Sequence, residues 1–183
     1  MTTSPEQPVP RAPQRIATLL TVLGLCLPLT GCVPQGLAFR VDERLRFLAP
    51  DDRSTVQLPV TVDWEITDFD VTKPGGETST ASGYFGVFVD TTPMPPGKDL
   101  RWLVRKDRGC READGCPDAE YLNARGIYTT TDTKLRLEQL PRTAKEDRRE
   151  RHRVTVVLLD ASGTRIGESA FELAFDIDRK ALS

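Results

Sequence analysis

A single histidine, His152, limits the acid–base chemistry that this 183-residue sequence could perform. Acyl transfer needs a nucleophile, a base and an orienting acid. His152 stands at the start of an apolar run that is typical of a β-strand, where a histidine is usually a surface residue or a satisfied structural one. The sequence therefore favours a protein that is not an enzyme. A hydrolase with an unrecognised site is the alternative.

Side chains that bind metals are also scarce. Copper sites use His, Met and Cys, and the chain has one His and two Met, one of them the initiator. Two carboxylate pairs could bind calcium or act as general acid and base, namely Asp68 with Asp70 and Asp114 with Asp118. Aspartate is also the usual turn residue, and we interpret both pairs in that way. We expect no metal site and no cofactor.

The four cysteines fall into two groups. Cys26 and Cys32 lie near the N-terminus, whereas Cys110 and Cys116 share one polar loop. Zinc would need two further ligands, and the spacing of this pair differs from that of a thioredoxin-like redox motif. In an oxidising compartment such a pair most simply forms a disulfide. Closing so short a loop would stabilise the protein by roughly 2 kcal/mol.

The N-terminal stretch has the order of an export signal. A polar leader containing Arg11 and Arg15 precedes an uncharged apolar run over residues 16–29, which is the n-region followed by the h-region. A transmembrane helix needs roughly 20 apolar residues, and this run is shorter and contains Pro28. We therefore expect a signal peptide here and not a membrane span.

The apolar run ends in Leu29, Thr30, Gly31 and Cys32. These residues resemble a bacterial lipobox, at which a prolipoprotein is lipidated on the cysteine and cut just before it. The resemblance implies a signal peptide over 1–31, acyl chains such as palmitate on Cys32, and an extracytoplasmic location at the cell membrane. The alternatives are an ordinary cleaved signal peptide and a short uncleaved anchor.

The mature chain, residues 32–183, is long enough for one domain with an apolar core. The whole chain has 25 basic and 27 acidic residues; removing Arg11, Arg15 and Glu6 leaves 23 and 26, a net charge of −3. A weakly acidic surface of mixed charge gives no electrostatic footprint for nucleic acid. The expected partners are the membrane, through the lipid, and an envelope protein or glycan.

Period-two patterns predict strands in the rest of the chain. Residues 60–66 place Val60, Val62 and Trp64 on one face and polar residues on the other. The run 83–90 is apolar on both faces, which indicates a central strand. Further strands are expected at 44–48, 100–104, 126–131 and 134–140, with a hairpin of arms 152–159 and 165–177, a helical turn at 118–124 and a charged loop at 142–151.

About seven strands separated by turns predict a single antiparallel β-sandwich over 43–178, after a tether at 32–42. Residues 58–64 resemble the second strand of fibronectin type III and related immunoglobulin-like domains, in which the Trp is a core residue. More of the chain resembles small bacterial exported immunoglobulin-like domains of unknown function, at 48–50, 59–64, 83–90, 129–141 and 152–160. Some relatives carry histidines where this chain has Tyr84 and Phe85, so no metal role is carried over.

Residues 91–128 contain more material than a strand connection requires. They include a proline-rich loop at 93–97 and the cysteine loop. Stiffened loops lose little entropy on binding, and aromatic residues contact partners effectively. We therefore expect a binding surface here, with Trp102 and Tyr121 partly exposed and close together. The candidate residues are Met94, Trp102, Tyr121 and Tyr128. The alternative is that the aromatic residues merely cover one end of the core.

Overall fold

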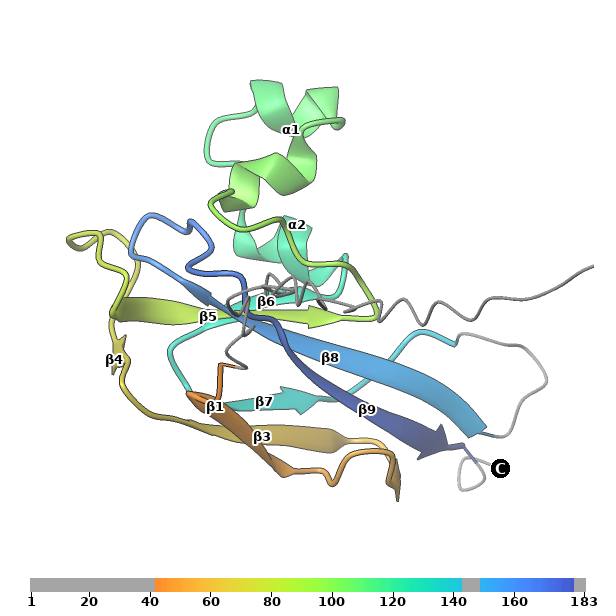
Figure 1. Ribbon diagram of the computed structural model, residues 1–183. Coiled ribbons are helices and arrows are strands. Elements are labelled where there is room, and N and C mark those ends of the chain that lie inside the picture. Colours follow the sequence, from red (N-terminus) through yellow and green to blue (C-terminus); the bar gives the residue numbers. More distant parts are fainter. Residues whose placement is uncertain (1–41, 143–148, 180–183) are drawn as a thin grey trace, which may run out of the picture. The chain divides into compact units, whose positions relative to one another are not determined.

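The computed structural model describes residues 42–142 and 149–179. The predicted signal peptide and Cys32 lie outside the described residues. The elements are β1 (Leu45–Ala49), β2 (Thr55–Val56), β3 (Val60–Ile66), β4 (Asp70–Val71), β5 (Ser82–Val89), η1 (Leu100–Val104), α1 (Arg108–Glu112), α2 (Ala119–Asn123), β6 (Ile127–Thr130), β7 (Lys134–Leu137), β8 (Arg149–Leu159) and β9 (Phe171–Asp178) (Figure 1). The described chain is therefore mostly β.

These strands form two sheets. The smaller sheet has the order β1-β3-β7 and is antiparallel. The larger sheet has the order β2-β9-β8-β5-β4, with β6 also paired to β5. The long strands of this sheet pair antiparallel, but the two-residue strands β2 and β4 run parallel to β9 and β5. The structure thus corrects the expectation of a purely antiparallel fold, and its described strands number nine and not about seven.

One apolar core lies between the two sheets. Trp64 of β3 is 1% exposed and meets Phe85 of β5 edge to face, with 5.4 Å between the ring centroids. Val62 of β3 and Phe175 of β9 belong to the same cluster of buried side chains. The period-two pattern of residues 60–66 is therefore confirmed. An edge-to-face pair of aromatic rings adds about 0.5 to 1.5 kcal/mol to the burial of their surfaces.

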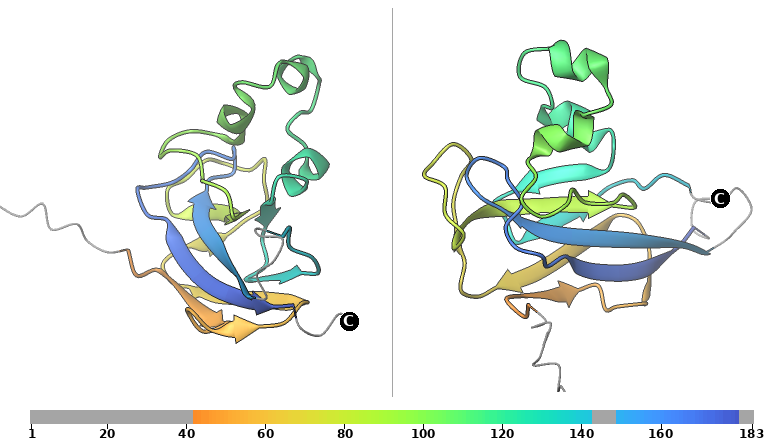
Figure 2. Two further views of the ribbon diagram at one scale, coloured as in Figure 1. Left: turned by 90° about the vertical axis from the view of Figure 1, so that its right-hand side faces the viewer. Right: turned by 45° about the horizontal axis from the view of Figure 1, so that its top comes forward.

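Strand β5 is buried on both faces because a second layer covers its outer side. Phe85 points into the main core, whereas Phe88 belongs to a second cluster with Leu122 of α2. Figure 2 shows the helices stacked on this side of the larger sheet. At the start of the strand, Gly83 has φ +153°, and a Cβ there would lie 1.8 Å from the carbonyl oxygen of Leu159. Only glycine allows so close an approach.

Residues 93–126, called the insert below, contain the three helices found among the described residues. The predicted strand at 100–104 is wrong, because η1 begins there with Asp99 as its N-cap and the Asp99 carboxylate accepts from the Trp102 N–H. Asp107 and Asp118 cap α1 and α2 in the same way. The helical turn expected at 118–124 is confirmed. Cys110 and Cys116 form the expected disulfide, which fixes the end of α1.

The predicted C-terminal hairpin is present, with shifted ends. Strand β8 begins at Arg149, so the last part of the predicted charged loop at 142–151 is strand, and Glu150 within it is buried. Strand β9 begins at Phe171, opposite Val156, and not at 165. The chain near Arg165 instead bonds to the insert, because its N–H donates to the Lys98 carbonyl. Residues 143–148 lie outside the described residues.

Candidate ligand-binding groove

A groove of about 790 Å³ lies where the insert meets the end of β5. One wall comes from α2 and the start of β6, with Tyr121, Arg125 and Tyr128. The other comes from the end of β5 and from residues 139–141, and includes Asp90 and Leu140. The structure therefore brings together Tyr121 and Tyr128, two of the aromatic residues expected to bind. We call this groove the tyrosine groove.

Contacts within the insert hold Tyr121 in place. Its hydroxyl donates to Oδ2 of Asp107 at 2.6 Å, and the Arg125 guanidinium lies 3.5 Å from the centre of its ring. This hydrogen bond raises the pKa of Tyr121 above its ordinary value and lowers the pKa of Asp107. Arg125 also pairs with Asp107 at 3.5 Å. Tyr121 is only partly buried and lines the groove, with one face of its ring covered by Arg125.

The other candidate residues have different positions. Tyr128 is partly buried, packs against the main core and lines the groove. Trp102 is partly buried against the second cluster, as Tyr121 is, but it does not line the tyrosine groove. Met94 is 0% exposed and belongs to the second cluster, so the expectation that it lies on a binding surface is wrong. A proline-flanked methionine there fills the space between the insert and the sheet.

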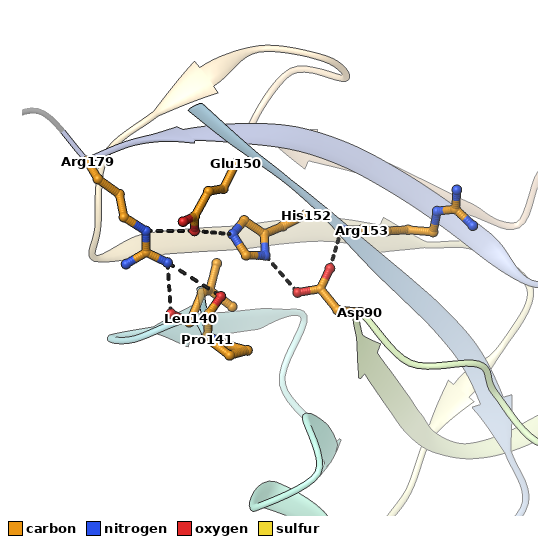
Figure 3. Close-up of polar contacts among 7 residues, drawn as sticks. All are labelled: Asp90, Leu140, Pro141, Glu150, His152, Arg153 and Arg179. Carbon is orange, nitrogen blue, oxygen red and sulfur yellow. Dashed lines mark hydrogen bonds and ion pairs between the residues drawn. The ribbon is translucent and has the colours of Figure 1, made fainter. Parts of the chain in front are cut away.

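A chain of ionisable side chains connects Asp90, whose side chain is 24% exposed, with Arg179 through the buried His152 and Glu150 (Figure 3). His152 and Glu150, both on β8, are 0% and 1% exposed. His152 donates from Nδ1 to Oδ2 of Asp90 at 2.6 Å, and its Nε2 lies 3.7 Å from Oε2 of Glu150. That carboxylate accepts from Nε of Arg179 at 2.7 Å. Two carboxylates, one imidazole and one guanidinium are thus arranged in a row, which we call the buried charge chain.

Both ends of the buried charge chain are tied to the backbone. Oδ1 of Asp90 accepts from the Arg153 N–H at 2.8 Å, and Nη2 of Arg179 donates to the Leu140 carbonyl at 2.9 Å. Asp90 has φ +53°, a conformation that aspartate tolerates better than most residues do. Asp90 and Leu140 line the same wall of the tyrosine groove, so the buried charge chain ties together the two segments that form this wall, the end of β5 and residues 139–141.

The geometry around His152 differs from that of a catalytic base. Asp90 occupies the place of an orienting acid, but Nε2 faces Glu150 and makes no hydrogen bond to any described residue. A smaller pocket of about 380 Å³ on the neighbouring surface is lined by Thr91, Thr92 and His152 among others. The imidazole itself is completely buried, so a ligand in this pocket does not reach it.

Metal ligands do not gather elsewhere either. Within residues 42–142 and 149–179, no group of three or more His, Cys, Asp or Glu side chains is arranged to hold a metal ion. The two aspartate pairs considered from the sequence include Asp118, whose carboxylate caps α2, and Asp68, which has φ +52° in a connection between strands. Asp118 therefore acts as a helix cap and Asp68 as a turn residue.

Sequence reasoning missed Asp90, Glu150 and Arg179. A signal for Glu150 was present in the chain, because residues 149–154 alternate between exposed and buried positions and Glu150 stands in phase with His152 and Val154. A charged residue in phase with core positions requires a buried partner. No such local pattern exists for Asp90 or Arg179, which are distant in sequence.

The chain matches no protein-family model, no curated protein and no solved structure. Among the described residues, no helix has the length and apolar character needed to cross a membrane.

Proposed function

We propose that this protein is a lipoprotein anchored to the cell membrane through Cys32, with an extracytoplasmic immunoglobulin-like β-sandwich that acts as a binding module of the cell envelope. The lipobox-like residues 29–32 and the preceding leader support the anchor. The two sheets with a shared core support the sandwich. The insert packs on the outer face of the larger sheet, whereas β1, the first described strand, belongs to the smaller sheet.

The observation that carries the binding role is the tyrosine groove. Its lining includes the aromatic residues Tyr121 and Tyr128 together with Arg125, Asn123 and Gln139. Aromatic faces beside planar hydrogen-bonding groups suit the apolar faces and hydroxyls of a sugar ring. We therefore infer that the partner is an envelope glycan, with peptidoglycan as the most abundant example to test.

A binding role is preferred over hydrolysis because His152 is 0% exposed and its Nε2 faces a carboxylate. A general base must reach the proton that it abstracts, directly or through one water. The hydrogen bonds that hold the wall of Asp90 and Leu140 also favour binding, since a site that is already ordered loses less entropy when a ligand enters.

The test is co-sedimentation of the full-length lipoprotein, in detergent, with purified peptidoglycan sacculi. Arg125→Ala and Tyr121→Ala should each reduce the bound fraction at least fivefold, because each removes one contact surface. Arg136→Ala is the matched control, because Arg136 is an exposed arginine on β7 of the other sheet. Melting temperatures of all variants separate lost binding from lost folding. Equal binding by Arg125→Ala, Arg136→Ala and the parent protein would exclude the groove as the glycan site.

If sacculi do not bind, chemical cross-linking in intact cells followed by purification of the lipoprotein tests for a protein partner. A partner whose cross-link depends on Arg125 and Tyr121 would keep the groove as the site and change its ligand class. The anchor is tested separately. Cys32→Ser should abolish labelling by a radioactive fatty acid, whereas unchanged labelling would exclude Cys32 as the lipidated residue.

A further inference from the structure

A second groove lies inside the insert, away from the tyrosine groove. It has a volume of about 470 Å³ and is formed by η1, α1 and the loop that ends at Cys116. Three of its lining residues are arginines, Arg101, Arg105 and Arg111, and one is an acid, Asp114. These four side chains carry a formal charge of +2, in a chain whose net charge is −2. We call this feature the arginine groove.

Within the described segments, Arg101, Arg105 and Arg111 differ from most other arginines in having no acidic partner. No described carboxylate lies within ion-pair distance of Arg101, Arg105 or Arg111, although most other arginines of the described segments are paired. Nearby, Arg108 pairs with Glu112 at 2.8 Å and Arg125 pairs with Asp107 at 3.5 Å. The arginine groove therefore carries positive charge that its one acid, Asp114, offsets only in part.

The groove is also partly ordered before any ligand enters. The Arg105 guanidinium lies 3.3 Å from the centre of the Trp102 ring, and its Nη1 donates to the Trp102 carbonyl at 2.9 Å. The Cys110–Cys116 disulfide fixes the opposite wall. Stacking on an aromatic face holds the planar fork of a guanidinium and leaves its remaining N–H groups free to donate. Trp102, which does not line the tyrosine groove, therefore has a role here as the ring that holds the Arg105 guanidinium.

We propose that the arginine groove is a binding site for a multiply charged oxyanion, such as a phosphate group or a cluster of carboxylates. Guanidinium groups bind both kinds of anion through paired, charge-assisted hydrogen bonds. A groove lined by three arginines and one acid is complementary to a ligand of charge −2 or more. The site is separate from the tyrosine groove and does not depend on the glycan proposal.

The experiment is isothermal titration calorimetry of the full-length protein with pyrophosphate and, in a second series, with citrate. The parent protein should bind at least one of them at low salt, and the affinity should fall as salt is added. Arg105→Gln and Arg111→Gln should each weaken binding at least fivefold. Arg108→Gln is the matched control, because this arginine is on α1 but lies outside the groove and pairs with Glu112.

The two ligands distinguish the sources of charge. Binding of pyrophosphate alone assigns the site to phosphate groups, and binding of citrate alone assigns it to carboxylates. Either outcome supports the proposal. Failure of both ligands to bind at low salt would overturn it. An equal loss in Arg105→Gln and Arg108→Gln would also overturn it, because net charge and not the groove would then be responsible. Sacculus binding by Arg105→Gln stays at the parent level if the two sites are independent.

Discussion

His152 and Asp90 are joined by a hydrogen bond of 2.6 Å, although 62 residues separate them in the sequence. The bond connects the first half of β8 to the residue that follows β5, and the histidine is completely buried. A buried imidazole without this carboxylate would lose its partner on Nδ1. The pair therefore helps to fix the end of the central strand, which is also one wall of the tyrosine groove.

Removal of the Asp90 carboxylate should destabilise the fold. We expect Asp90→Ala to lower the free energy of unfolding by about 1 to 3 kcal/mol, because the buried His152 N–H loses its acceptor, whereas the Arg153 N–H is exposed and can bond to water. Asp68→Ala is the matched control, since Asp68 is exposed as Asp90 is and has nearly the same φ, +52° against +53°, but is not bonded to the buried histidine. Urea unfolding of both variants measures the difference. Equal losses would assign the whole effect to backbone conformation.

The pair of Glu150 and Arg179 should show strong coupling. Removing one member of a buried ion pair costs about 3 to 5 kcal/mol, because the other charge is left buried. Glu150→Leu and Arg179→Met should each show a loss of this size, and the double variant should lose less than the sum. The exposed pair of Arg46 and Glu65 is the control cycle, with a coupling expected below about 1 kcal/mol. Additive losses at Glu150 and Arg179 would contradict the ion pair.

Stability at low pH should depend on Asp42. Hydrogen bonds from Arg44 lower the pKa of Asp42 from 3.8 to about 2. Because the pKa is lower in the folded state, the stabilisation is fully present above pH 4 and is lost as the pH falls towards 2. We expect a contribution below about 2 kcal/mol, since water screens part of the interaction. Asp42→Asn should remove this part of the pH dependence, measured by urea unfolding between pH 2 and 5. If the free energy of unfolding changed with pH by the same slope in Asp42→Asn and in the parent protein, the stabilising role of Asp42 would be contradicted.

Local patterns were sufficient to predict the main strands. Residues 60–66 and 82–89 form β3 and β5 because alternation, or a run apolar on both faces, depends only on neighbouring residues. The short apolar run at 100–104 was ambiguous, and the structure shows a helix there because Asp99 supplies an N-cap. The sequence does contain that signal, an aspartate three residues before Trp102, but strand and helix patterns overlap in so short a run.

The candidate sites could be predicted only in part. Tyr121 and Tyr128 were identified because aromatic residues in an extended connection stand out in composition. The buried charge chain could not be assembled, because its contacts join residues that are 29 and 62 positions apart. The interior position of Met94 likewise depends on the sheet face on which the insert packs. These features are consequences of tertiary structure and have no local pattern of their own.

Arg165 should hold the insert against the sheet. It is 7% exposed, and its guanidinium donates to the carbonyls of Met94 at 2.6 Å, Glu168 at 2.8 Å and Ser169 at 3.1 Å. Arg165→Met preserves the apolar stem but leaves these carbonyls without that donor. We expect a loss of about 2 to 4 kcal/mol in the free energy of unfolding, because buried carbonyl groups that lose their hydrogen-bond donor are costly.

The same variant should loosen the chain next to Met94 before the rest of the fold. The N–H of Gly97 donates to the Arg165 carbonyl, so hydrogen exchange at this amide should be at least about tenfold faster in Arg165→Met. Arg153→Met is the matched control, because Arg153 is an exposed arginine on β8. Exchange at amides in β3 should change little in both variants. If Gly97 exchanged at the same rate in Arg165→Met as in Arg153→Met, the guanidinium would not be what holds the insert.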